Sequence, residues 1–191
     1  MERASPLDQL LEVAHRRALL SLEAARELQS EGFADPAFVW AVRSVEIFTK
    51  EWMLAPAYMT HEGLDLSRAM KRASRKFGSS NWQAAFHEIE RLCGPIDPML
   101  TEANADAWLH WQKRAVTQRG DIVHGRPASS ATPEEVSSVI AYAGQLIDQL
   151  TLRMLTTDRH PAGSRFRSAL QRGIDAVHGA SLSNDPEEAP G

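Results

Sequence analysis

Apolar residues recur every three or four positions along most of this chain, which is the spacing of one buried face of an α-helix. The first run follows Ser5 and Pro6, which suit the N-cap and the first turn of a helix, with Asp8 three residues after the cap. Gly32 is the natural stop. The apolar positions between them are Leu7, Leu10, Leu11, Ala14, Ala18, Leu22, Ala25 and Leu28. The pattern predicts one long N-terminal helix.

Two further start signals delimit long helices. Asp35-Pro36 predicts the start of a second helix, whose apolar stripe runs to an expected break at Ala55-Pro56. Thr132-Pro133-Glu134-Glu135 is a capping box, with a threonine cap, proline at the first helical position and glutamate at the third. It opens the most regular apolar stripe of the chain, formed by Val136, Val139, Ile140, Ala143, Leu146, Ile147, Leu150 and Met154.

Shorter helices are expected in the rest of the chain. Residues 67–77 and 81–92 predict two of them, and Asn104 is the expected cap of another that ends near Arg119-Gly120. No segment alternates apolar and polar residues for long enough to predict a strand. The expected fold is therefore all-α, an antiparallel bundle of four to six helices over residues 1–160. An extra helix is expected within 161–180, starting near Phe166, and a disordered acidic tail at 181–191.

The composition narrows the classes of function. A formal net charge of −4 argues against a protein that coats nucleic acid, although a local basic site stays open. No apolar stretch approaches the about 20 residues that cross a bilayer, and the N-terminus lacks the features of a secretory signal. The single cysteine, Cys93, excludes an internal disulfide and fits a reducing compartment. We therefore expect a cytoplasmic protein without membrane contact.

One segment suggests a reaction, namely Arg119-Gly120-Asp121-Ile122-Val123-His124-Gly125. In a continuous helix a separation of five residues turns through about 500°, so the arginine and histidine side chains would diverge by about 140°. Gly120 can take the left-handed conformation that ends a helix and redirects the chain. We therefore expect the helix to end at Gly120, with His124 in a loop.

The arrangement resembles the HEPN superfamily. The resemblance is carried by Arg-x4-His at the end of a long helix, followed by Gly125 and by the Thr-Pro-Glu-Glu start of the next helix. Ser44-Val45-Glu46, with Lys50 four residues after the glutamate, is similar to the second helix of many HEPN proteins. Taken alone, Glu46 and Lys50 are an ordinary solvated i,i+4 pair. The resemblance spans roughly residues 7–155, but its specific part is short.

The resemblance implies a helical domain that dimerises, so that two Arg-x4-His motifs meet in one cleft and cleave RNA without a metal or cofactor. A histidine that titrates near neutral pH can move protons to and from the ribose 2′-hydroxyl and the leaving 5′-oxygen. An arginine can hold the scissile phosphate and offset its developing charge. His124 and Arg119 are the expected catalytic residues in these roles, and Asp121 is expected to orient one of them. The products would be a 2′,3′-cyclic phosphate and a 5′-hydroxyl.

Two positions depart from the family pattern. Gly120 stands where many active HEPN motifs carry Asn, Asp or His, and Asp121 comes one place later. Arg126 stands where HEPN toxins that are modified by a partner nucleotidyltransferase carry tyrosine, which argues against that pairing here. The resemblance also implies a role as a toxin or in antiviral (phage) defence, with an antitoxin or a regulatory protein as partner.

Basic residues near the motif are candidate contacts for the RNA backbone. Lys113 and Arg114 precede Arg119, and Arg126 follows His124. Lys71 and Arg72 belong to the densest basic run of the chain, although such a run is more often a solvated helix face. The seven histidines are scattered, so the sequence predicts no metal site.

The alternative is a non-catalytic helical adaptor or RNA-binding module that uses its apolar helix faces for dimerisation. Geometry distinguishes the two hypotheses. If Arg119 and His124 are exposed in a cleft shared across a two-fold axis, the enzyme is favoured. If either residue is buried in an ion pair within its own bundle, the adaptor is favoured.

Overall fold

The computed structural model describes residues 5–76, 82–95, 115–126, 130–169 and 171. These residues are mostly helical and include no strand, so the all-α prediction is confirmed for this part of the chain. The expected caps of the helix from Asn104 and the expected tail at 181–191 lie outside the described residues.

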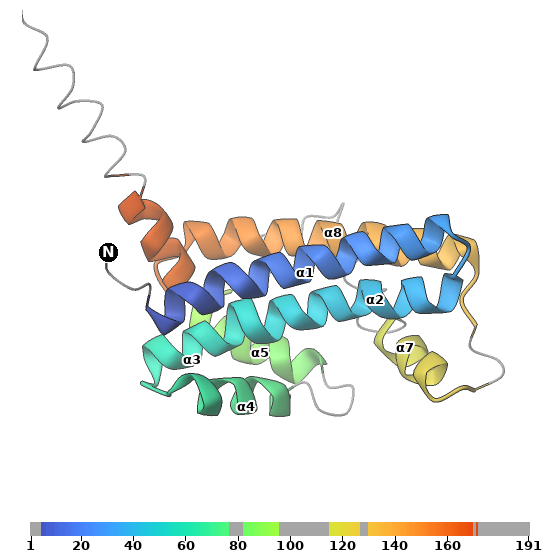
Figure 1. The fold of residues 1–191 in the computed structure, drawn as a ribbon. Coiled ribbons are helices and arrows are strands. Elements are labelled where there is room, and N and C mark those ends of the chain that lie inside the picture. Colours follow the sequence, from blue (N-terminus) through green and yellow to red (C-terminus); the bar gives the residue numbers. More distant parts are fainter. Residues whose placement is uncertain (1–4, 77–81, 96–114, 127–129, 170, 172–191) are drawn as a thin grey trace, which may run out of the picture.

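Three long segments form the body of the molecule. In Figure 1, α1 (Pro6–Ser30) runs antiparallel to α2 (Ala34–Ile47) and to α8 (Pro133–Thr156). The contact between α1 and α2 is close because small residues meet there. Ala14, Ala18 and Ala25 on α1 and Ala37 and Ala41 on α2 are completely buried.

The local start and stop signals of α1 and α8 are confirmed. The Ser5 hydroxyl accepts a hydrogen bond from the Asp8 amide, and the Asp8 carboxylate accepts one from the Ser5 amide in return. Thr132 and Glu135 form the same reciprocal pair at the start of α8. Gly32 has a φ of 86°, the left-handed conformation that follows a helix end. Each of these features involves residues within one turn of each other.

Asp35 does not cap α2, contrary to the prediction. The helix begins one residue earlier, at Ala34, and Phe33 is its N-cap without a side-chain hydrogen bond. The Asp35 carboxylate instead accepts a hydrogen bond from the amide of Ala131, at 2.7 Å, just before the start of α8. The Asp35 side chain, which the local pattern predicts to cap α2, therefore makes a tertiary contact instead.

The expected break at Ala55-Pro56 is also wrong. The chain continues from α2 through the π-helix η1 (Phe48–Leu54) into α3 (Ala55–His61) without interruption. A proline inside an α-helix removes one hydrogen bond, and its ring collides with the carbonyl four residues earlier. The wider π-turns directly before Pro56 change that register, since the Ala55 amide donates to the Lys50 carbonyl, five residues back.

His160, which follows α8 in the chain, packs against η1 in the continuous helical rod formed by α2, η1 and α3. Its Nε2 lies 3.2 Å from the Met53 carbonyl oxygen, to which it donates, while its Nδ1 accepts a hydrogen bond from the Ala162 amide. The ring is completely buried and packs on Trp52, with 5.1 Å between the ring centroids. Burial lowers the pKa of His160 to about 4, so this histidine is neutral at pH 7. Pro161 then begins a helix over residues 161–169, earlier than the expected start near Phe166.

The remaining helices lie along one side of this body. α4 (Leu66–Lys76) and α5 (Trp82–Cys93) pack beside α3 at one end, and α7 (Val116–Val123) packs against α2 at the other end (Figure 1). The largest completely buried side chains come from most of these elements and form one core: Phe38, Phe48, Met53, Leu54, Tyr58, Ile89, Leu146, Ile147, Leu150 and Met154. Within the described residues, we find no helix with the length and apolar character that a membrane span requires.

Candidate functional site: the Arg119–His124 helix and its contact with α2

The helix that carries Arg119 continues past Gly120, contrary to the prediction. α7 ends at Val123, and His124 is its C-cap residue. The Gly125 amide bonds to the Ile122 carbonyl and the Arg126 amide bonds to the Asp121 carbonyl, which together form a Schellman motif. Gly125 is the left-handed residue of this motif, with a φ of 65°, and Gly120 has an ordinary helical backbone. The chain reverses direction at Gly125, because this glycine takes the left-handed conformation directly after the C-cap residue of α7.

Arg119 and His124 therefore leave the same short helix in different directions. The Arg119 side chain is turned toward α2 and is 31% exposed. His124 is exposed at the C-terminal end of the helix, beside the exposed Val123. Among the described residues, no hydrogen bond or ion pair joins Arg119, Asp121 and His124 to one another. A single chain does not bring the arginine and the histidine to one point.

Arg119 contacts Glu46 of α2. Its Nη2 lies 3.6 Å from Oε2 of Glu46, whose side chain is 13% exposed. The local sequence pattern predicts for Glu46 only a solvated i,i+4 pair with Lys50 and gives no link to Arg119. The one signal for the contact is the resemblance to HEPN proteins, which is carried by two segments, 44–50 with Glu46 and 119–125 with Arg119. The structure shows that these two segments touch.

The Arg119 guanidinium keeps a donor that the described residues leave unsatisfied. Its Nε is buried and has no hydrogen-bond partner among them. A buried donor without a partner costs about 1–3 kcal/mol. The 3.6 Å separation from Glu46 is also longer than the about 2.7–2.9 Å of a charge-assisted hydrogen bond. Arg119 is thus loosely held, with a distant charge partner and an unpaired buried Nε.

Asp121 pairs with Arg126 and not with either expected catalytic residue. The Arg126 Nη1 lies 2.7 Å from Oδ1 of Asp121, across the Schellman turn. Since the Arg126 side chain is 70% exposed, this ion pair contributes little to stability. Its effect is to draw Arg126 back over the turn beside His124.

α7 is attached to the bundle by few contacts. None of its residues is buried; Ile122 is partly buried against the core, and Val123 is 55% exposed. Besides Arg119, Gln118 reaches out of the helix and donates to Glu135 of the capping box of α8, at 3.2 Å. The helix is therefore positioned by polar contacts to α2 and α8, with most of its residues partly buried and only Thr117 and Val123 exposed.

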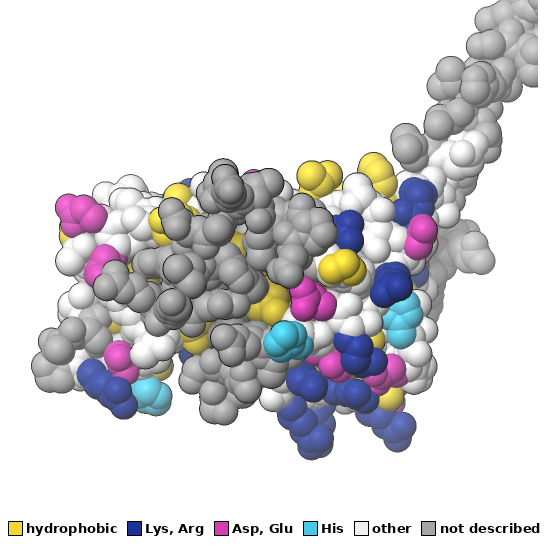
Figure 2. Space-filling view, turned by 180° about the vertical axis from the view of Figure 1, so that it is seen from behind, with side chains coloured by type: hydrophobic (Ala, Val, Ile, Leu, Met, Phe, Trp, Pro, Cys, Tyr) yellow, Lys and Arg dark blue, Asp and Glu magenta, His cyan; other side chains and the backbone are white. Residues whose placement is uncertain are grey.

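The expected RNA contacts do not form one surface around α7. Lys113 and Arg114 lie outside the described residues. Lys71 and Arg72 are on α4, and Figure 1 places α4 and α7 at opposite ends of the bundle. Figure 2 shows lysine and arginine side chains gathered at the end of the molecule that α4 occupies, where Arg68, Lys71 and Arg75 are exposed. Of the described candidates, Arg126 alone lies beside Arg119 and His124.

Arg72, whose side chain is 45% exposed, is engaged in a charge network at the surface of α3, α4 and α5. Its Nη1 lies 2.5 Å from Oε2 of Glu62, and its guanidinium lies 4.8 Å from the ring centre of Tyr58. The Tyr58 hydroxyl donates to the buried Glu88, at 2.8 Å. Hydrogen bonds from Arg91 are the main cause that lowers the pKa of Glu88 to about 2. The inward half of the basic run therefore holds α3, α4 and α5 together, a role that the sequence pattern did not indicate.

Within the described residues, no group of three or more His, Cys, Asp or Glu side chains is arranged to hold a metal ion. Comparisons of the chain with protein-family models, curated proteins and solved structures found no match. The arrangement of Arg119, His124 and their neighbours is therefore what bears on function.

Proposed function

We propose that this protein is a metal-independent endoribonuclease of the HEPN type that acts as a homodimer. The contact between Arg119 and Glu46 carries the proposal. It brings together the two separate segments whose residues resemble HEPN proteins, 44–50 and 119–125, although nothing in the local pattern of either segment requires them to meet. A chance occurrence of Arg-x4-His would give no reason to expect a contact between these two segments.

The chemistry assigned to each residue follows its environment. His124 is exposed at the end of α7 and can exchange protons with the ribose 2′-hydroxyl or the leaving 5′-oxygen. Arg119 offers its guanidinium to the scissile phosphate, which would replace the loosely held Glu46 as its main partner. In-line attack by the 2′-oxygen on phosphorus breaks the bond to the 5′-oxygen. It leaves a 2′,3′-cyclic phosphate and a 5′-hydroxyl.

A second copy of the chain completes the site in this proposal. One chain supplies one motif histidine, His124. The attack of the 2′-oxygen benefits from a base, and the departure of the 5′-oxygen benefits from an acid. A two-fold contact between α7 helices supplies both from one short motif. The exposed Val123 and the absence of any buried residue on α7 support a contact at this helix. The divergence of Arg119 and His124 within one chain supports it further, because an arginine from one copy can act with a histidine from the other.

The same ion pair favours a second candidate function, since an ion pair of Arg119 buried within its own bundle is the geometry expected of the adaptor, although at 31% exposure Arg119 is only partly buried in it. Glu46 neutralises part of the charge of Arg119 within its own bundle, and an arginine of that kind can serve the packing of α7 alone. In that case the chain is a helical dimerisation or adaptor module without activity. The two candidates differ in one outcome, the cleavage of RNA.

The test is incubation of the purified protein with total RNA and with a labelled oligoribonucleotide in EDTA. We expect cleavage whose 3′ fragments accept a 5′ kinase label without prior phosphatase treatment, since the leaving 5′-oxygen becomes a hydroxyl on them. His124→Ala should lose about 10²–10⁴-fold in rate, the usual contribution of a general acid or base. His87→Ala is the matched control, because His87 is also highly exposed, on α5. Equal rates for the two variants, or loss of cleavage on chelation, would leave the adaptor as the function.

A further inference from the structure

A cavity of about 630 Å³, widely open to solvent, lies between the first half of α1, the last half of α8 and the helix over 161–169. Its walls are formed mainly by the apolar residues Leu11, Leu19, Trp52, Leu155, Ala162 and Phe166. This volume is within the range of about 300–1,000 Å³ typical of small-molecule sites. The elements that line it meet at the end of the bundle opposite α7 in Figure 1, and no residue of α7 lines it, so it is separate from the proposed ribonuclease site.

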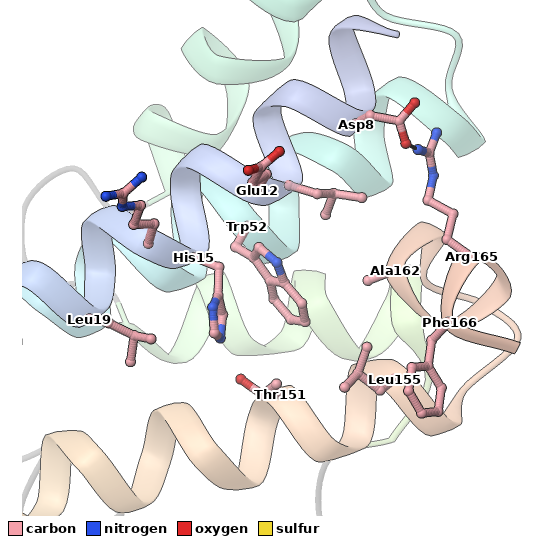
Figure 3. Close-up of a pocket in the computed structure, with 12 residues that line it drawn as sticks. Asp8, Glu12, His15, Leu19, Trp52, Thr151, Leu155, Ala162, Arg165 and Phe166 are labelled. Atoms are coloured by element: carbon pink, nitrogen blue, oxygen red, sulfur yellow. Dashed lines mark ion pairs between the residues drawn. The ribbon is translucent and has the colours of Figure 1, made fainter. Parts of the chain in front are cut away.

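Two polar side chains face each other inside this cavity. Figure 3 shows the Thr151 hydroxyl on α8 directed toward the His15 ring on α1, with the Trp52 indole beside them. The Thr151 Oγ1 is buried and has no hydrogen-bond partner among the described residues. Threonine in a helix usually donates to a carbonyl of the preceding turn, as Thr156 does to Leu152 on the same helix. Thr151 therefore keeps a donor and an acceptor for a polar atom in the cavity.

His15 and Trp52 make an aromatic floor. The His15 ring lies 5.7 Å from the Trp52 ring and 6.1 Å from Phe48, which in turn stacks on Trp52 at 4.8 Å. Burial lowers the pKa of His15 although Asp148 opposes the shift, so the imidazole is mainly neutral at pH 7. A neutral imidazole has one donor and one acceptor nitrogen. Trp52 belongs to the π-helix η1, and π-helical turns often occur at functional sites.

The charges around the cavity cancel. Asp8 and Glu12 are opposed by Arg16 and Arg165 along its edge. Asp8 and Arg165 form an ion pair at its edge, drawn as a dashed line in Figure 3. A ligand with a net charge would gain nothing from this balance and would lose its hydration. An apolar body with one uncharged oxygen matches both the walls and the pair of polar groups.

We propose that this cavity binds a small, uncharged aromatic molecule with a hydroxyl group, whose oxygen lies between Thr151 and His15. Its rings pack on Trp52 and between the apolar walls. The hydroxyl both donates and accepts, as the two facing side chains require. The site does not depend on ribonuclease activity or on dimerisation through α7.

The test uses 2-naphthol as the probe on the full chain, with binding measured by calorimetry at pH 7. Naphthalene, which lacks the hydroxyl, and 2-naphthoate, which carries a charge, are the matched probes. We expect saturable binding of 2-naphthol, with both other probes weaker. Thr151→Val keeps the shape of the side chain and should remove about three- to tenfold of the preference for 2-naphthol over naphthalene, the usual effect of one hydrogen bond. An unchanged preference, or tighter binding of 2-naphthoate, would overturn the proposal.

A pair of variants tests the location. Leu19→Trp places a larger side chain at the edge of the cavity, and it should weaken 2-naphthol at least tenfold. Leu20→Trp is its control, since Leu20 is 51% exposed on the same helix and does not line the cavity. Equal affinities of the two variants would overturn the proposal. A dimer in solution that Leu19→Trp disrupts and Leu20→Trp does not would also overturn it, by showing that a second copy covers this face.

Discussion

Arg119 Nη2 on α7 lies 3.6 Å from Glu46 Oε2 on α2, so one ion pair joins the helix of the candidate site to the long central rod. The pair is partly shielded, with the glutamate the more buried partner. It decides how the arginine is presented, because Glu46 holds the guanidinium against α2. The proposed ribonuclease chemistry requires that the scissile phosphate can exchange with Glu46 as the partner of Arg119.

The first prediction concerns this exchange. Glu46→Gln keeps the side-chain size and removes the charge that competes with phosphate. We expect the KM for RNA to fall and the free energy of unfolding to drop by no more than about 1 kcal/mol, as for other partly exposed ion pairs. Arg119→Ala should instead abolish cleavage while the protein stays folded. Cleavage kinetics and thermal unfolding measure both effects. A Glu46→Gln protein that binds RNA more weakly than the parent would contradict the proposed exchange.

The second prediction concerns the shared site. Arg119→Ala and His124→Ala should each be inactive as homodimers. Mixed dimers contain one intact arginine and one intact histidine on different chains, so mixing the variants should restore part of the activity. The restored rate should increase with the fraction of mixed dimers, measured by native mass spectrometry. A mixture that stays inactive despite exchange of subunits would show that one Arg119 and one His124 on different chains do not suffice for cleavage.

The third prediction separates the two glycines of the motif. Gly125 has a φ of 65°, and a side chain there strains the backbone, so Gly125→Ala should lower the free energy of unfolding by about 1–2 kcal/mol. Gly120 is helical, and a Cβ added to it meets nothing within 4 Å. Gly120→Ala should therefore raise that free energy by about 0.5–1 kcal/mol. Chemical denaturation of both variants measures the difference. If Gly120→Ala lowered the free energy of unfolding and Gly125→Ala raised it, the helix would end at Gly120 and not at Gly125.

The fourth prediction concerns pH. The pKa of His160 is about 4 in the folded chain and about 6.5 when unfolded, so acidification below pH 6.5 favours the unfolded chain. The stability contributed by the neutral ring is complete above pH 6.5 and is lost as the pH falls toward 4. The slope should reach about 1.4 kcal/mol per pH unit.

His160→Gln is the matched variant for that experiment, because its amide can still donate toward the Met53 carbonyl without titrating. We expect its free energy of unfolding to change less between pH 7 and pH 5 than that of the parent. His15, whose pKa is also lowered by burial, contributes equally to both proteins. Parallel pH profiles for parent and variant would mean that His160 does not titrate in this range.

The sequence by itself determined the helices whose signals are local. The capping boxes at Ser5 and Thr132, the stop at Gly32 and the apolar stripes of α1 and α8 all use residues within a few turns of each other. Such interactions form in any context that leaves the segment helical, so the pattern alone predicts them. The motif around Arg119 and His124 could be located in the same way.

Other features follow only from the tertiary structure, because contacts with neighbouring elements override the local preference of the sequence there. Pro56 stays inside a continuous rod because η1 changes the helical register and the buried His160, distant in sequence, binds the Met53 carbonyl. Glu46 becomes the partner of Arg119 because α7 packs on α2, which no spacing along the chain encodes. Arg72 pairs with Glu62, at the end of α3, although its side chain stays 45% exposed, because an ion pair with a partly buried carboxylate satisfies its charge. Each of these outcomes depends on which surfaces meet, and that follows from the packing of the whole core.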